Sequence, residues 1–176
     1  MKKVLIIILS LVALVATATV YAGSRESAPQ GATMSKKRSI MELPLFERAV
    51  LIIKKFETLH KPRHWPYVGY GHQVQPGEPY RRGCQLTEAQ ADALLRKDLR
   101  KFCALYSEYG KDSVLLGALA YNCGPGVVNK STVLKKLKRG DRNIFKSYTS
   151  HCRYKGKWHK GLYTRRLTEI AILFIR

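Results

Sequence analysis

The chain has 176 residues, and 32 Lys and Arg against 12 Asp and Glu give it a formal net charge of +20 at pH 7. This length is enough for one domain with a sizeable core, and no internal repeat is visible. A charge balance as one-sided as this favours a polyanionic partner. The sequence has no phosphate-binding loop, no G-x-S-x-G motif and no Cys–His nucleophile pattern, so it does not indicate the enzyme classes that these motifs mark.

The first 22 residues have the pattern of an export signal. Lys2 and Lys3 precede an apolar run over residues 4–16, and small residues precede a cleavage position after Ala22. We therefore predict a signal peptide over 1–22 and a secreted or periplasmic protein. The alternative is an uncleaved membrane anchor, because the uncharged run over 4–21 approaches the roughly 20 residues of a spanning helix. Export favours anionic cell-envelope polymers over nucleic acid as the polyanion.

Residues 23–39 are rich in Ser, Ala, Gly and Lys and lack apolar periodicity, which predicts a flexible linker. The folded domain is expected over 40–176. Its first helix is predicted over 43–56, where apolar residues recur at spacings of three and four. Glu57 falls at the end of this helix, and Pro62 breaks it.

An aromatic stretch with Gly and Pro over 65–82 predicts a small β-hairpin or meander with a turn at 75–78. A helix over 86–102 follows, with Thr87 and Gln90 as a capping box. The next helix, 114–122, is capped by Asp112 in this interpretation. Because it is almost wholly apolar, we expect it to be buried at the centre of the domain.

Three further helices complete the expected order. Ser131 caps one that ends near Lys138, Asp141 begins another that runs towards His151, and a last amphipathic helix covers 164–174. The order is a helix, a small sheet and then helices only. It predicts an α+β fold with a cleft between a sheet lobe and a helical lobe.

Four cysteines allow two disulfides in an exported chain. A pair between Cys84 and Cys103 is excluded, because a helix between them separates the two by roughly 25 Å. Buried free thiols are the alternative, since Cys123 and Cys152 have apolar or aromatic neighbours in the sequence.

The chemical signal is Glu57 at a helix end, followed ten residues later by the glycine-rich segment Y-V-G-Y-G-H at 67–72. Cleavage of a glycosidic bond requires a carboxylic acid that keeps its proton near neutral pH. Apolar neighbours such as Phe56, Trp65 and Tyr67 would raise the pKa of a Glu by disfavouring its charged form.

Six segments, taken in order, resemble the phage-type lysozyme family. They are F-E-T-L, Y-V-G-Y-G-H, L-T-E-A-Q-A-D-A-L-L-R-K-D-L, A-L-A-Y-N-C-G-P-G, S-T-V-L-K-K-L-K-R-G-D and G-L-Y-T-R-R-L-T-E. The match extends over about 45–174, and it looks especially like the lysozyme-like proteins of conjugative elements. The resemblance implies a lysozyme-like fold and a muramidase that cleaves the β-1,4 bond between N-acetylmuramic acid and N-acetylglucosamine.

By this resemblance, Glu57 takes the place of the family's catalytic acid. The residues that we expect to bind substrate are Tyr70, His72, Tyr121, Asn122 and Arg166. The family histidine that His72 matches is usually structural, holding the hairpin through a hydrogen bond.

The chain departs from the family between Glu57 and Gly69, where the family has an Asp and a Thr that position the attacking water. This segment is about five residues shorter here and contains no carboxylate. His60, His64 or Tyr67 would have to replace them, and we favour His64 and Tyr67.

The missing Asp leaves two alternatives open. A lytic transglycosylase needs a single acid/base, and A-Y-N-C-G at 120–124 resembles the transglycosylase motif. A catalytically inactive module that binds glycan or scaffolds an envelope complex is the other. We expect peptidoglycan as the partner, a secretion or conjugation complex as a possible second one, and a monomer. No cofactor or metal is expected, because Pro62 prevents His60 and His64 from aligning on a helix.

Overall fold

The computed structural model describes residues 39–175. The predicted signal peptide over 1–22 and all but the last residue of the predicted linker over 23–39 lie outside the described residues and stay predictions. Ser39 caps a short 3-10 helix, η2 (Ile40–Glu42). The compact unit that carries the rest of the fold begins at Pro44.

Helix α2 (Leu45–Glu57) is the first element of this unit. Its apolar side buries Ala49, Val50, Ile52 and Ile53 against α4 and α8. The helix predicted over 43–56 is confirmed, and its bounds differ by one or two residues. Glu57 is its last residue, as expected.

A hairpin of two-residue strands follows, in which β1 (Tyr67–Val68) pairs antiparallel with β2 (His72–Gln73). The 3-10 helix η3 (Pro62–His64) leads into it. Gly69 and Gly71 have φ of +57° and +95°, which only glycine adopts readily. The predicted turn at 75–78 is confirmed by a hydrogen bond of 3.2 Å from the Glu78 N–H to the Gln75 carbonyl. Regular pairing is thus confined to the start of the predicted meander.

Helix α3 (Glu88–Ala104) begins with the predicted capping box of Thr87 and Gln90. The 3-10 helix η4 (Ser107–Asp112) then leads into α4 (Ser113–Cys123), which packs against α2, α3, α5 and α8. Six consecutive residues of α4, from Leu115 to Ala120, are buried, so the prediction of a central apolar helix is confirmed. Asp112 is the N-cap residue of α4, as predicted, but its carboxylate makes no capping bond and pairs with Arg142 instead.

The remaining elements are α5 (Pro125–Lys130), α6 (Thr132–Lys138), α7 (Phe145–Thr149), β3 (Arg153–Tyr154), β4 (Lys157–Trp158) and α8 (Lys160–Leu173). The Ser131 hydroxyl caps α6 by accepting a hydrogen bond from the Leu134 N–H, as predicted. The expectation of helices only after the first sheet is wrong, because β3 and β4 form a second antiparallel hairpin. Its turn places Lys155 and Gly156 at positive φ, the geometry of a two-residue hairpin loop.

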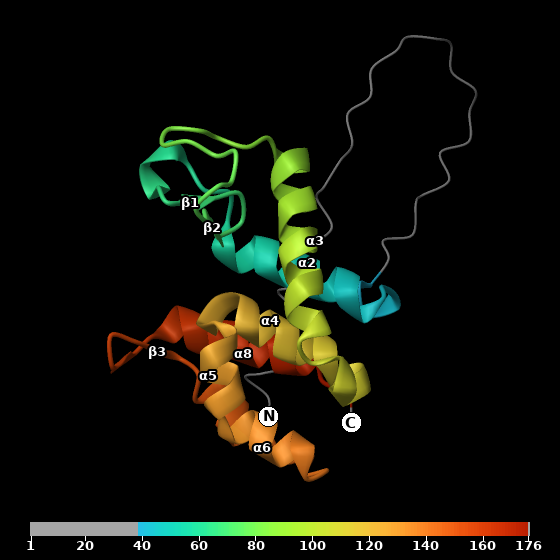
Figure 1. Ribbon diagram of the computed structural model, residues 1–176. Coiled ribbons are helices and arrows are strands. Elements are labelled where there is room, and N and C mark those ends of the chain that lie inside the picture. The colour runs from blue at the N-terminus through green and yellow to red at the C-terminus, as the bar shows by residue number, and fades with distance from the viewer. Residues whose placement is uncertain (1–38, 176) are drawn as a thin grey trace, which may run out of the picture. The chain divides into compact units, whose positions relative to one another are not determined.

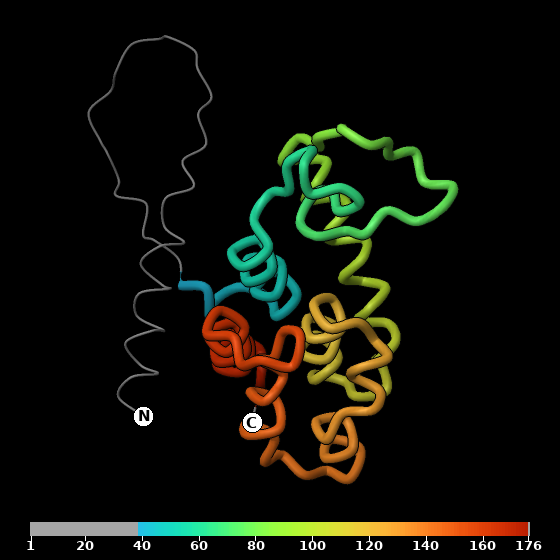
Figure 2. Tube along the Cα trace, turned by 90° about the vertical axis from the view of Figure 1, so that its left-hand side faces the viewer, coloured from blue at the N-terminus to red at the C-terminus, as the bar shows by residue number. Residues whose placement is uncertain are grey.

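The elements form a lobe around the β1–β2 hairpin and a lobe of helices, and α3 extends from one to the other (Figures 1 and 2). This is the predicted α+β arrangement. All four cysteines are free, so of the two alternatives, disulfides or free thiols, the structure has free thiols. Within residues 39–175, no helix combines the length and the hydropathy of a membrane span.

Candidate active site

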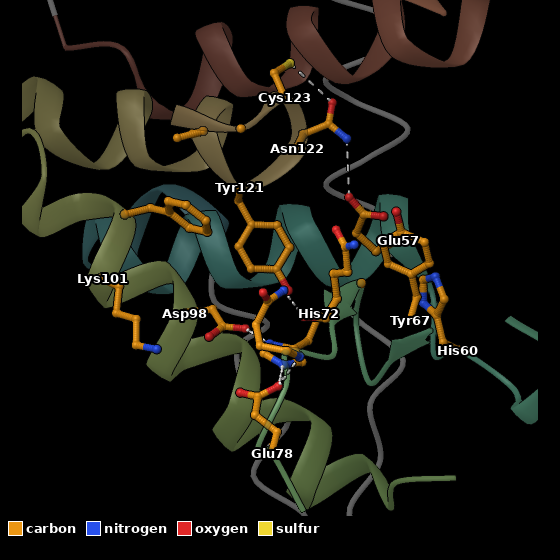
Figure 3. Close-up of a pocket in the computed structure, with 16 residues that line it drawn as sticks. Glu57, His60, Tyr67, His72, Glu78, Asp98, Lys101, Tyr121, Asn122 and Cys123 are labelled. Atoms are coloured by element: carbon orange, nitrogen blue, oxygen red, sulfur yellow. Dashed lines mark hydrogen bonds and ion pairs between the residues drawn. The ribbon is translucent and has the colours of Figure 1, made fainter. Parts of the chain in front are cut away.

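A pocket of about 720 Å³ opens between the β1–β2 hairpin, α3 and the end of α4. Figure 3 shows side chains from these elements converging on it, with Glu57 reaching it from the end of α2. Its lining residues are Glu57, His60, Tyr67, Gly71, His72, Gln73, Gln75, Glu78, Asp98, Lys101, Phe102, Ala120, Tyr121, Asn122, Cys123 and Gly124.

The Glu57 carboxylate is held from several sides. Its side chain is 20% exposed, and Oε1 accepts hydrogen bonds from Arg165 Nη1 at 2.5 Å and from Asn122 Nδ2 at 3.4 Å. A Cβ on Gly71 would lie only 3.3 Å from Glu57 Oε2, so the glycine lets the carboxylate approach the hairpin backbone. Directly after the helix, Thr58 turns the chain at a φ of +57°.

The surroundings of Glu57 correct one expectation from the sequence. We expected an apolar setting made by Phe56, Trp65 and Tyr67, and the carboxylate is instead ion-paired with a guanidinium. The reason lies far along the chain, because Arg165 is on α8, 108 residues after Glu57.

Arg165 belongs to a buried network on α8 centred on Glu169, whose side chain is 0% exposed. Glu169 Oε1 accepts from Arg165 Nε at 2.9 Å and from Arg166 Nη2 at 3.1 Å, and Oε2 accepts from the Tyr148 hydroxyl at 2.8 Å. Arg166 Nη2 also donates to Asn122 Oδ1 at 3.0 Å. Because Asn122 donates to Glu57, the bonds close a ring of five side chains behind the pocket.

The formal charges of this ring cancel when Glu57 is ionised, since two carboxylates face two guanidinium groups. Burial by itself lowers the pKa of Arg165, but the charges of Glu169 and Glu57 outweigh it and raise that pKa. Burial and the nearby Glu169 raise the pKa of Tyr148, so its hydroxyl stays a hydrogen-bond donor. Arg165 is therefore a fixed positive charge beside Glu57.

The predicted structural role of His72 fits its two ring bonds. Nδ1 contacts Asp98 Oδ2 at 2.6 Å and Nε2 contacts Glu78 Oε2 at 2.7 Å. The hydrogen bond to Asp98 and then that to Glu78 raise the pKa of His72 despite its burial. His72 lines the pocket, and with both nitrogens engaged it fastens the hairpin to α3.

The two residues that we favoured as replacements for the missing Asp and Thr differ in placement. Tyr67 lines the pocket with its side chain 43% exposed. His64 does not line it, and its ring nitrogens contact the Lys61 N–H at 3.1 Å and the Arg63 Nε at 3.3 Å, both outside the pocket. His60, the third candidate, does line the pocket and contacts the Tyr67 ring, with centroids 6.2 Å apart.

The structure also sorts the residues that we expected to bind substrate. Tyr121 and Asn122 line the pocket, and the Tyr121 hydroxyl donates to the Tyr70 carbonyl at 2.8 Å. Tyr70 is buried outside the pocket lining and bonds to Glu88, and Arg166 is fully buried in the ring behind Glu57. Neither the Tyr70 nor the Arg166 side chain reaches the pocket, so this geometry does not support substrate contact by either residue.

The sequence analysis missed Arg165, Glu169, Asp98 and Glu78. A signal for the first two was present, because Arg165, Arg166 and Glu169 are spaced for ion pairs on a helix whose only other charged residue is Lys160. Across residues 39–175, no group of three or more His, Cys, Asp or Glu side chains is arranged to hold a metal ion.

Comparison with known proteins places these observations in a family. The family model "Phage lysozyme" matches residues 54–169. The SAR-endolysin of Bacteriophage PS119 is 35% identical in an alignment of 112 residues that covers 58% of this chain. The SAR-endolysin of Enterobacteria phage P21 is 34% identical in an alignment of 112 residues that covers 60% of this chain. The matches span 64% and 66% of those two relatives, slightly less than two thirds.

Two solved structures share the fold. The endolysin from Escherichia coli O157:H7 phage FAHEc1 superposes with a TM-score of 0.62 at 26% identity, over 75% of this chain and 94% of that one. The muramidase domain of SpmX from Asticaccaulis excentricus also has a TM-score of 0.62, at 24% identity, over 73% of this chain and 95% of that one. The fold is therefore lysozyme-like.

Proposed function

Because the chain belongs to the phage lysozyme family, we propose that it is a peptidoglycan hydrolase that cleaves the β-1,4 bond between N-acetylmuramic acid and N-acetylglucosamine. One observation carries the proposal. Glu57, which takes the place of the family's catalytic acid by resemblance, lies in a pocket of about 720 Å³ that is lined by polar and aromatic side chains. A pocket of this size fits sugar units of a glycan strand.

In this proposal Glu57 protonates the glycosidic oxygen of the leaving sugar. Arg165 stabilises the carboxylate that remains after the transfer, because its guanidinium already bonds to Oε1. Glu169 and Asn122 act as positioning residues, since Glu169 orients Arg165 and Asn122 contacts Glu57 directly. Fixed dipoles and charges of this kind favour a charge-developing step without reorganisation.

In the same proposal Tyr67 and His60, which lie beside Glu57 in Figure 3, position the attacking water. Both line the pocket, and Tyr67 is the first residue of the glycine-rich segment Y-V-G-Y-G-H. We expect Tyr67→Phe to lower the hydrolysis rate about tenfold or more, because only the hydroxyl that orients water is removed. His60→Ala should also lower it, whereas His64→Ala, a neighbour outside the pocket, should leave it within about twofold. Equal effects of the two histidine variants contradict this assignment.

Lytic transglycosylase activity is the second candidate, and one observation favours it. Of the described residues that line the pocket, only Glu78 and Asp98 carry a further carboxylate, and both are bonded to His72. Neither is free to activate water beside Glu57. A transglycosylase needs no such group, because the 6-hydroxyl of the substrate is the nucleophile.

Mass spectrometry of the fragments released from purified peptidoglycan separates the candidates. Reducing N-acetylmuramic acid ends support the hydrolase, and 1,6-anhydro ends support the transglycosylase. Glu57→Gln should abolish release of either product, whereas Glu78→Gln, a second pocket carboxylate, should retain it. No release by the unmodified chain, together with binding to the same peptidoglycan, indicates an inactive glycan-binding or scaffolding module.

We further propose that the protein acts outside the cytoplasm, either secreted or periplasmic after cleavage at Ala22 or anchored if uncleaved. The apolar run over 4–21 supports both forms. Mass spectrometry of the protein purified from its host decides between them, because a chain that starts at Gly23 requires cleavage. Co-purification from the same cells tests whether it works as a monomer or within a secretion or conjugation complex.

A further inference from the structure

The β3–β4 hairpin is a projecting cationic and aromatic element that the catalytic proposal does not use. Figure 1 shows it extending from the helices just before α8. All eight residues from Arg153 to Lys160 are exposed, and two of them are large aromatics, Tyr154 at 61% and Trp158 at 57%. Exposed aromatic groups of this size on a protruding element mark interaction sites.

The pairing register places one aromatic and one cation on each face of the hairpin. Arg153 pairs with Trp158 and Tyr154 pairs with Lys157, and cross-strand partners share a face. Lys155 lies in the turn. A partner with a flat surface, such as a sugar ring, would cover only one of the two faces. A partner that surrounds the tip would cover both aromatics at once.

The charge around the hairpin is of one sign. Between Asp141 and Glu169 the sequence contains eight Lys and Arg and no Asp or Glu. In the hairpin, Arg153 Nη1 donates to the Gly156 carbonyl, and Lys155 Nζ lies over the Tyr154 ring at 5.5 Å. These contacts involve no carboxylate, so the cations remain available to an anionic partner.

We propose that the β3–β4 hairpin inserts its tip into the headgroup layer of an anionic phospholipid membrane. Trp and Tyr favour that layer because each has an apolar ring with a polar group, and Lys and Arg bind its negative charge. In the uncleaved form of the chain, the apolar run over 4–16 would hold the protein at the same surface. Contact with the membrane would then hold the enzyme beside the wall that it cuts, although the proposal does not depend on catalysis.

Tryptophan fluorescence of the full chain tests this directly. Subtracting the spectrum of Trp158→Phe from that of the unmodified chain isolates Trp158 from Trp65, so the signal reports the hairpin alone whatever the N-terminal segment does. With vesicles that contain phosphatidylglycerol, we expect a blue shift of Trp158 and quenching by brominated acyl chains. With pure phosphatidylcholine vesicles both effects should be much weaker.

Charge variants supply the matched control. Lys155→Asn with Lys157→Gln should raise the lipid concentration for the half-maximal shift by roughly twenty-five-fold, which is about fivefold for each cation removed. Lys135→Gln with Lys138→Gln removes the same charge from α6, and this pair should change the lipid concentration for the half-maximal shift less than threefold. An equal response of Trp158 to both vesicle types, or no response to either, overturns the proposal. A response to purified peptidoglycan instead of vesicles does so too. The same holds if the two pairs of variants need the same lipid concentration for the half-maximal shift.

Discussion

Replacing Glu169 with Gln tests whether charge pairing in the buried ring behind Glu57 stabilises the fold. Glu169 is fully buried, and its two oxygens are bonded to Arg165, Arg166 and Tyr148. Glu169→Gln keeps the shape but leaves two guanidinium groups facing a single carboxylate, that of Glu57. Removing one partner of a buried ion pair costs about 3 to 5 kcal/mol. With a urea m-value of about 2 kcal/mol/M, the unfolding midpoint should fall by roughly 2 M.

Glu47→Gln is the matched control, because Glu47 likewise accepts two hydrogen bonds from arginine, in this case both from Arg96, at 2.6 and 2.9 Å. Its side chain is 37% exposed, and an exposed pair of this kind contributes less than about 1 kcal/mol. The measurement is urea unfolding of both variants followed by circular dichroism. If Glu169→Gln costs no more than Glu47→Gln, the charges of the ring do not stabilise the fold and the reasoning is refuted.

Two further predictions concern packing and pH. Gly117→Ala should lower the free energy of unfolding by about 1 to 3 kcal/mol. The reason is that an added Cβ would lie 2.7 Å from Cys103 Sγ and 3.0 Å from the Cys103 backbone N. An unchanged urea midpoint would show that α3 and α4 have room to separate. For His72, whose pKa is raised in the folded state, the stabilisation is fully present below the unfolded pKa of about 6.5 and is lost as pH rises through the folded value. The stability advantage of the unmodified chain over His72→Asn should therefore be larger at pH 6 than at pH 9, and an equal advantage at the two values would contradict a protonated His72 between Asp98 and Glu78.

Much of the fold could be predicted because its helices carry local signals. The capping box at Thr87, the apolar run of α4 and the position of Glu57 at a helix end all depend on residues a few positions apart. The β3–β4 hairpin could not be predicted in the same way. Its residues are exposed on both faces, so no alternation of apolar and polar residues marked it.

The candidate site was predicted less completely, for a physical reason. Glu57 could be identified from its place in the sequence, but its partner Arg165 is 108 residues away. Which charged residues of α8 become buried depends on how that helix packs against α2, and helical periodicity does not determine this. His64 was favoured over His60 for the same lack of information, because only the path of η3 decides which histidine lines the pocket.

The central claim is that Glu57 supplies the proton that breaks the glycosidic bond, and one rate comparison tests it most directly. The measurement is the release of new sugar ends from purified peptidoglycan by the unmodified chain and by Glu57→Gln, at equal concentrations of folded protein and equal binding to the substrate. The account predicts a fall in rate of about a hundredfold or more with binding preserved. A Glu57→Gln variant that keeps its rate within tenfold of the unmodified chain would contradict it.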